Sequence, residues 1–450
     1  MAQEIYRAST TNDFCSTDIV IGEHQLRYFP REMHENLIVL DRNFFSLFPD
    51  RFRSDVALND LKVDQKIRNE VAEYLSKIMD KDYDLAICLA DKGIALRGAL
   101  PNTRIISVVE SYFTRKPFPN LWNVDLCGID DTDTMNTMHD SIVNMTLSAK
   151  EQNFLNYFRE NYRNLLHSDG IFSEKLNNIK PFGLLPLQHQ NVSAVEMYSR
   201  HHSQMDLLID ILNHCTDNYN ILATEHPQYP ELSKTSYTWL RETYRNFKFF
   251  PDFFRFEGLS QGLLKYADFC VCQTSTVGVQ AATIWNLPVY QASHQNRVTP
   301  FSVGCFNSNS KKLKSKLTET KSCELDKQLF FVLTRLSHSR SDLVSAKGFK
   351  RIIGNIMAGG TCIEIYANLA KSKDMLTYHR THIEKAEKTA VGARPFKSLI
   401  HLENNPISLI GSWEAETLPS DKPRRKNDKI GWMARKWKKL KKLSKTIMVK

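Results

Sequence analysis

The stretch KYADFCVCQTSTVGVQAA, residues 265–282, decides the fold class of this 450-residue chain. Residues 269–272 form an apolar run that predicts a strand covered on both faces. A cluster of Thr and Ser follows this run, and residues 276–285 then predict a helix. A strand, a polar turn and a helix in this order are typical of βαβ winding, in which ligands bind at the carboxyl ends of the strands.

The rest of the chain repeats this alternation. In the second half we expect helices and strands in turn, with strands at residues 182–187, 219–224 and 287–290 and helices at 203–214 and 259–266. In the first half we expect strands at residues 37–40, 84–89 and 104–109 and helices at 65–79 and 148–166. Continuous apolar runs between helices favour parallel sheets. The predicted fold class is therefore α/β, with two such domains and an appendage.

A turn at residues 168–170 and changes in composition further along divide the chain into segments. Residues 1–170 are expected to form the first α/β domain and residues 171–345 the second. The polar, Lys/Ser-rich segment 307–324 is expected to be a surface loop, and helical patterns resume at residues 329–336 and 349–374. Beyond the second domain we expect helices that pack across both domains, a flexible linker and a basic amphipathic helix, at residues 346–401, 402–428 and 429–450.

The positive charge is concentrated at the end of the chain. The formal net charge is +10, but residues 422–450 alone carry thirteen Lys and Arg against one acid, Asp428. The tail therefore carries +12 and the remainder about −2. The body of the protein is thus not a basic nucleic-acid-binding domain.

The tail has the pattern of a membrane-surface helix. Apolar residues from Ile430 to Ile447 recur at helical spacing among Lys and Arg. A stripe of this kind predicts a helix in a bilayer interface, where anionic lipids attract the ammonium groups. A solvated basic tail and a nucleic-acid-binding tail are the alternatives. The residues expected to contact the membrane are Trp432, Trp437, Lys438, Lys439, Lys441 and Lys442.

The apolar and cysteine patterns bear on location. Residues 1–18 lack a positive start followed by an apolar run, so no secretory signal is expected. No stretch approaches the roughly 20 apolar residues of a membrane-spanning helix. We therefore expect a cytoplasmic protein that is peripheral at the inner face of the cytoplasmic membrane. The nine cysteines are scattered, which favours reduced thiols over zinc ligands.

Three polar clusters stand where predicted strands of the second half end. Gln188 lies in a run of four polar residues, and His226 is followed by Pro227, which fixes an extended backbone at the strand end. Ser275 and Thr276 open the helix, where hydroxyls and free backbone N–H groups form an anion site. An ordinary loop, a structural turn and simple helix capping are the respective alternatives.

The three clusters in this order resemble a known family. Residues 265–282, with NLPV at 286–289 and His226-Pro227 upstream, resemble the nucleotide-binding half of GT-B glycosyltransferases. More narrowly, they are similar to the capsular polysaccharide biosynthesis family, which includes β-Kdo transferases that use CMP-Kdo. Bacterial sialyltransferases carry similar motifs. The resemblance covers residues 180–300 well and the rest loosely. It implies two Rossmann-like domains that face a cleft, the first on the acceptor side and the second binding the nucleotide donor.

The resemblance also implies an activity and residue roles. The expected protein is an enzyme that transfers a sugar from a CMP-activated donor to a glycan or lipid-linked acceptor, with no metal and no other cofactor. Glu110 and His226 are the expected catalytic residues, and Arg115 is expected to bind the acceptor or an anionic sugar. The residues expected to bind the donor are Gln188, His226, Pro227, Thr274, Ser275, Thr276 and Gly278.

Two features leave alternatives open. Relatives of the family carry an Asp-Ser pair where this chain has Asn191, and an amide cannot act as a nucleophile or base. Transfer of glycerol or ribitol phosphate from a CDP donor, or a non-catalytic scaffold, are therefore alternatives. The Asp-x-Asp within residues 130–133 suggests a metal-dependent transferase, but the polar surroundings favour a solvated loop.

Overall fold

The computed structural model describes most of the chain up to residue 386. The described residues are 1–386 except 12–13, 49–64, 80, 114–116, 167–171, 191, 216–218, 227–230, 252, 254–257, 307–316 and 372–373. They all belong to one compact unit. The predicted linker and basic tail helix, including the membrane-contact residues named above, lie outside the described residues.

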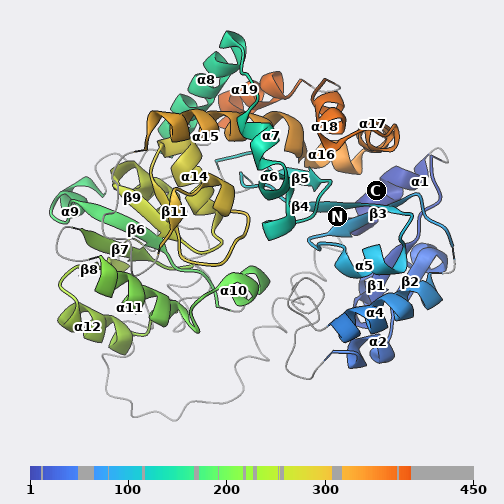
Figure 1. Cartoon of the computed structure of the whole chain (residues 1–450), viewed down its shortest axis with the longest axis horizontal. Helices are drawn as coiled ribbons and strands as arrows, with labels where there is room; N and C mark the ends of the chain where they lie inside the picture. The colour runs from blue at the N-terminus through green and yellow to red at the C-terminus, as the bar shows by residue number, and fades with distance from the viewer. Residues whose placement is uncertain are drawn as a thin grey trace, which may run out of the picture. The chain divides into compact units, whose positions relative to one another are not determined.

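A six-stranded parallel sheet forms the centre of the second half (Figure 1). Its strand order is β11-β10-β9-β6-β7-β8, and every neighbouring pair is parallel. The strands are β6 (Phe182–Pro186), β7 (Asn220–Thr224), β8 (Phe247–Lys248), β9 (Phe269–Cys272), β10 (Val289–Gln291) and β11 (Gly304–Cys305). The four strands predicted in this half are confirmed as β6, β7, β9 and β10, and β6 and β9 are buried along their whole length.

Helices connect these strands, as βαβ winding requires. The helices of this half are α9 (Ser173–Asn177), α10 (Ser193–Tyr198), α11 (Gln204–His214), α12 (Lys234–Thr243), α13 (Leu259–Leu263) and α14 (Thr276–Trp285). The predictions for residues 203–214 and 276–285 are confirmed. Helix α14 packs directly on β9 and β10.

Gly278 allows α14 to approach β9 closely. A Cβ atom at this position would lie 2.3 Å from the Cys272 Sγ atom, although Ala is otherwise favoured over Gly in a helix. We expect Gly278→Ala to lower the free energy of unfolding by about 1–3 kcal/mol, as overpacking does. Urea unfolding measures this change.

Two variants serve as controls for the Gly278 prediction. At Gly354, inside α17, an added Cβ meets nothing within 4 Å, so Gly354→Ala is expected to stabilise by about 0.5–1 kcal/mol. The double variant Cys272→Ala/Gly278→Ala removes the clashing sulfur and is expected to be less destabilised than the sum of the two single variants. A neutral or stabilising Gly278→Ala would contradict the close-packing explanation.

The first half contains a smaller mixed sheet rather than the predicted parallel one. Its order is β12-β5-β4-β3, where β3 and β4 are parallel but β5 is antiparallel to both β4 and β12. The ten residues between β4 and β5 are too few for a crossover, which needs a dozen or more. The strands are β3 (Leu85–Leu89), β4 (Arg104–Glu110), β5 (Leu121–Asp125) and β12 (Ser337–Ser339). A separate parallel pair consists of β1 (Ile19–Gly22) and β2 (Leu37–Leu40).

Helices surround this sheet from both ends of the chain. Those of the first half are α1 (Ala2–Thr10), α2 (Arg42–Ser46), α4 (Gln65–Ile78), α5 (Ile94–Ala99), α6 (Thr134–Thr137), α7 (His139–Val143) and α8 (Ala149–Leu165). Those that follow the second half are α15 (Glu319–Phe331), α16 (Arg340–Val344), α17 (Ala346–Met357), α18 (Cys362–Lys371) and α19 (Met375–Ala386). Figure 1 shows α8, α15 and α19 beside one another.

The prediction that residues 307–324 form a surface loop is wrong for residues 319–324. Residues 319–324 open α15 because the Thr318 side chain caps the helix, accepting from the Lys321 N–H at 3.2 Å. Within the described part of the chain, no helix has both the length and the apolar composition needed to cross a membrane.

Candidate functional site

The carboxyl ends of β6, β7 and β9 bring two of the predicted clusters together. The Gln188 Nε2 group donates to Thr274 Oγ1 at 2.9 Å, and the Thr274 backbone N–H donates to Gln188 Oε1 at 3.0 Å. The end of β7 lies alongside, because the Leu187 N–H donates to the Thr224 carbonyl at 2.8 Å. We call the surface around Gln188, Thr274 and the start of α14 the polar edge. In α/β sheets such an edge is where ligands bind.

The amino end of α14 lies at the polar edge. Ser275 caps the helix by accepting from the Val277 N–H at 3.3 Å, and Thr276 is the first helical residue. At the other end, Arg159 and Arg163 of α8 donate to the carbonyls of Thr283 and Ile284, each at 2.7 Å. Cations at the carboxyl end complement the negative end of the helix dipole, and the positive amino end favours an anion.

The Glu225-His226 dipeptide follows β7 at the same edge of the sheet. His226 is half-buried, and Pro227 lies outside the described residues, as does Asn191. The buried Glu225 carboxylate accepts from the backbone N–H groups of Glu231 and Leu232, each at 2.8 Å. Burial raises the pKa of Glu225 to about 8, even though these hydrogen bonds act in the opposite direction.

A network of buried amides supports the polar edge, and sequence reasoning missed it. Gln204 Oε1 accepts from the Gln188 backbone N–H at 2.9 Å, and Gln204 Nε2 donates to Gln273 Oε1 at 2.7 Å. The Gln273 carbonyl accepts from Ser293 Oγ at 2.9 Å and from Asn296 Nδ2 at 3.3 Å. The amide network, as we call it, consists of Gln188, Gln204, Gln273, Ser293 and Asn296.

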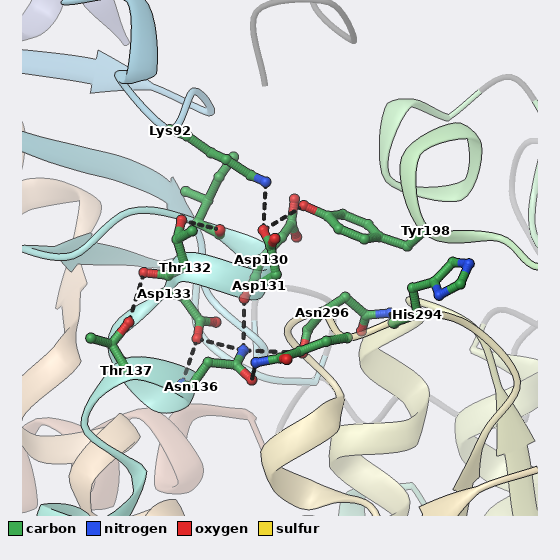
Figure 2. Close-up of polar contacts among 12 residues, drawn as sticks. Lys92, Asp130, Asp131, Thr132, Asp133, Asn136, Thr137, Tyr198, His294 and Asn296 are labelled. Carbon is green, nitrogen blue, oxygen red and sulfur yellow. Dashed lines mark hydrogen bonds and ion pairs between the residues drawn. The ribbon is translucent and has the colours of Figure 1, made fainter. Parts of the chain in front are cut away.

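The acidic segment of residues 130–133, predicted to be a solvated loop, is largely buried. Asp130 is 9% and Asp133 4% exposed. Figure 2 shows Lys92 and Tyr198 meeting Asp131: the Lys92 Nζ to Asp131 Oδ1 distance is 2.5 Å, and the Tyr198 hydroxyl donates to Oδ1 at 2.8 Å. The prediction was wrong because the groups that bury this acidic loop come from distant parts of the sequence.

Burial raises the pKa of two carboxyl groups in the acidic loop. Burial, followed by the nearby Asp125 carboxylate, raises the pKa of Asp133 to about 7, while the Tyr112 hydroxyl donates to Asp133 Oδ2 at 2.7 Å. Burial also raises the pKa of Asp130, although Arg297 and Lys92 act in the opposite direction. Asp130 has a left-handed φ of 56°, which Asp tolerates better than most residues. Among the residues that the structure describes, no group of three or more His, Cys, Asp or Glu could hold a metal ion.

Glu110 ends β4 with an exposed side chain. Its carbonyl accepts from Arg297 Nη2 at 3.1 Å, and the Arg297 guanidinium lies 4.6 Å from the centroid of the Tyr112 ring. Glu110 therefore lies beside the loop that follows β10. Arg115 lies outside the described residues. Sequence reasoning missed Arg297, because no strand end or motif marks it.

Comparisons with known proteins found distant structural likeness only. No family model and no curated protein matches the chain. KpsC of Thermosulfurimonas dismutans, described as a β-Kdo 2,7-transferase, is 14% identical with a TM-score of 0.40, and the match covers 71% of this chain and 91% of that one. A KpsC structure of the same organism, described as a β-Kdo 2,4-transferase, is 12% identical with a TM-score of 0.36, covering 63% and 86%.

A sugar-nucleotide enzyme is also similar. The UDP-GlcNAc 2-epimerase of Methanocaldococcus jannaschii, solved with UDP-GlcNAc and UDP, is 10% identical with a TM-score of 0.25, covering 79% of this chain and 95% of that one. Since all three TM-scores are below 0.5, the likeness carries no argument about this chain, and its function has to be inferred from the polar edge itself.

Proposed function

We propose that this chain is a glycosyltransferase that binds a nucleotide-activated sugar at the polar edge. One observation carries the proposal: the Gln188–Thr274 pair sits at the carboxyl ends of parallel strands, beside the amino end of α14. The positive end of the α14 dipole and the hydroxyls of Ser275 and Thr276 suit a phosphate group. The sequence resemblance to GT-B enzymes supports the same reading, with His226, Pro227 and Gly278 in the donor site.

The proposed reaction needs a leaving-group site and a base. The acceptor hydroxyl gives its proton to Glu110, its oxygen forms the new glycosidic bond, and the sugar–phosphate bond breaks with its electrons on the nucleotide phosphate. The amino end of α14 and His226 stabilise that developing negative charge. Glu110 is exposed at a strand end, which leaves its carboxylate accessible to an acceptor.

The finer features of the proposal come from the sequence. They are a CMP-sugar donor such as CMP-Kdo, two domains that face a cleft, a glycan or lipid-linked acceptor, and action without a metal. Arg115 would bind an anionic sugar, and the basic tail, from Trp432 to Lys442, would hold the enzyme at the inner face of the cytoplasmic membrane. A CDP-glycerol or CDP-ribitol donor is the alternative within the same chemistry, and a non-catalytic scaffold is the alternative outside it.

Thermal unfolding with CMP, CDP, UDP, GDP and ADP tests the proposal. A ligand that binds only the folded state raises the free energy of unfolding by RT ln(1 + [L]/Kd), and the melting temperature rises with it. We expect CMP to stabilise the wild type. We expect the shift to be lost in His226→Ala and strongly reduced in Thr274→Val, which removes the hydroxyl that accepts from Gln188. Thr243→Val, at the exposed end of α12, is the matched control and should keep the full shift.

Each other outcome of the nucleotide panel has a distinct meaning. Stabilisation by UDP or GDP alone would retain the nucleotide site and overturn the CMP donor. No stabilisation by any nucleotide would contradict the transferase proposal and favour the scaffold. Retention of the CMP shift in both Thr274→Val and His226→Ala would place the nucleotide away from the polar edge.

A further inference from the structure

Both the amide nitrogen and the amide oxygen of the Asn296 side chain form hydrogen bonds within the protein. Its side chain is fully buried, and Nδ2 donates to Ser293 Oγ at 2.8 Å, to the His294 carbonyl at 2.9 Å and to the Gln273 carbonyl at 3.3 Å. Its Oδ1 accepts from the Val298 N–H at 2.9 Å. The side chain thus fixes the backbone of its own loop against the end of β9.

The backbone carbonyl of Asn296 continues the chain of hydrogen bonds toward the acidic loop. Asn136 Nδ2 donates to this carbonyl at 3.1 Å, to Asp133 Oδ1 at 3.0 Å and to the Asp130 carbonyl at 2.7 Å. Figure 2 shows Asn136 lying between Asn296 and the acidic loop. Asp133 then accepts from the Tyr112 hydroxyl, and Tyr112 is two residues beyond Glu110.

Most residues in this series of hydrogen bonds share one chemical character. From Gln188 to Asn136 they are neutral amides and hydroxyls, which do not titrate and cannot relay net charge. Buried groups of this kind are costly to leave unpaired, about 1–3 kcal/mol each, so removing one link disturbs its neighbours. Such a series is suited to holding two loops at a fixed distance rather than to moving protons.

We propose that Asn296 and Asn136 are positioning residues, through which the polar edge fixes the end of β4 where Glu110 lies. This inference rests on the proposed function for the role of Glu110 and of the nucleotide. Binding of a nucleotide at Gln188 and Thr274 restricts the motion of the amide network. The hydrogen bonds of Asn136 then restrict the motion of Asp133 and, through it, of Tyr112. Neither Asn touches the reacting atoms.

Hydrogen exchange measured by mass spectrometry on the full chain tests the proposal. We compare wild type with Asn136→Ala, with and without saturating CMP. Without CMP, we expect exchange at residues 107–113 to rise about tenfold in the variant, with β6 and β9 unchanged. With CMP, we expect protection of residues 107–113 in the wild type and none in the variant, while the Kd for CMP changes less than about threefold. A merely structural role of Asn136 would not remove this CMP-dependent protection.

Two further variants make the test independent of how well Asn136→Ala folds. Tyr112→Phe removes only the hydroxyl that reaches Asp133 and is expected to lose the same CMP-dependent protection. Asn355→Ala removes a similar half-buried amide, whose Nδ2 donates to the Arg351 carbonyl at 2.9 Å within α17, and should behave as the wild type.

Three results would overturn the inference. The first is unchanged exchange at residues 107–113 in both Asn136→Ala and Tyr112→Phe. The second is equal CMP protection of that segment in wild type and variants. The third is CMP binding to the wild type without any protection there. If no nucleotide binds the wild type, the proposed function fails, while the comparison without CMP still decides whether Asn136 positions the end of β4.

Discussion

Removing the Asp131 carboxylate is expected to cost about 3 kcal/mol of unfolding free energy, as breaking a buried ion pair does. The Lys92 side chain is 1% exposed, so in Asp131→Ala its ammonium group loses its closest counter-charge with almost no access to water. Asp131→Asn keeps an oxygen that can accept from Lys92 and is expected to cost less. Urea unfolding followed by circular dichroism measures both changes.

Two controls separate burial from pairing in the Asp131 prediction. Lys92→Met keeps the apolar stem and leaves Asp131 with the Tyr198 hydroxyl and its 20% exposure, so it is expected to cost clearly less than Asp131→Ala. The Lys77–Glu73 pair on α4 has a similar separation, 2.6 Å, but its side chains are 69% and 66% exposed. Glu73→Ala should cause no measurable loss. Equal losses of unfolding free energy in Glu73→Ala and Asp131→Ala would show that the buried pair contributes no more to stability than the exposed pair.

Stability is expected to fall as pH rises from about 5 to 8. The pKa of Glu225 is raised from 4.5 to about 8 and that of Asp133 from 3.8 to about 7, in both cases chiefly by burial. Between the unfolded and folded values the folded state binds more protons than the unfolded state. The free energy of unfolding therefore decreases with pH, by up to about 1.4 kcal/mol per pH unit for each group, and levels off above the folded pKa.

Glu225→Gln tests which group causes this slope. Gln cannot ionise, so the variant should lose the part of the slope that extends to pH 8, measured by urea unfolding at intervals from pH 5 to 8. Glu242→Gln on the exposed end of α12 is the matched control and should keep the wild-type slope. A wild-type slope in Glu225→Gln would mean that Glu225 does not take up a proton on folding.

Local sequence patterns predicted the second sheet well. The apolar runs that became β6, β7 and β9 are buried on both faces, so their hydrophobicity is continuous and easy to recognise. The pattern could not indicate β5, because its run contains two buried polar residues. Asn123 accepts from the distant Ser337, and Asp125 accepts from backbone N–H groups of the loop that follows β5, including that of Thr134. β12 is a short Ser-His-Ser strand, so its sequence likewise contains no apolar run that could indicate a strand.

Some residues of the candidate site could also be predicted from the sequence, and others could not. Strand-end position together with the family resemblance indicated Gln188 and Thr274, and the structure brings them into contact although they are 86 residues apart. The burial of the acidic loop could not be predicted, because it depends on Lys92 and Tyr198, which are 39 and 67 residues away from Asp131. The part that Gln204, Ser293 and Asn296 play in the amide network could not be predicted either, since these residues carry no periodic signal. The roles of Glu110 and His226 remain predictions.

The position of β12 has a consequence for how the protein is made. Ser337–Ser339 pairs with β5, so the β5 side of the first sheet stays unpaired until residue 339 has left the ribosome. At the usual rates of synthesis, the stretch between β5 and β12 takes about 10 to 40 s to translate. During that time the nascent first half exposes a strand that other chains can pair with, so chaperone binding is expected to matter most for emerging chains between these two lengths.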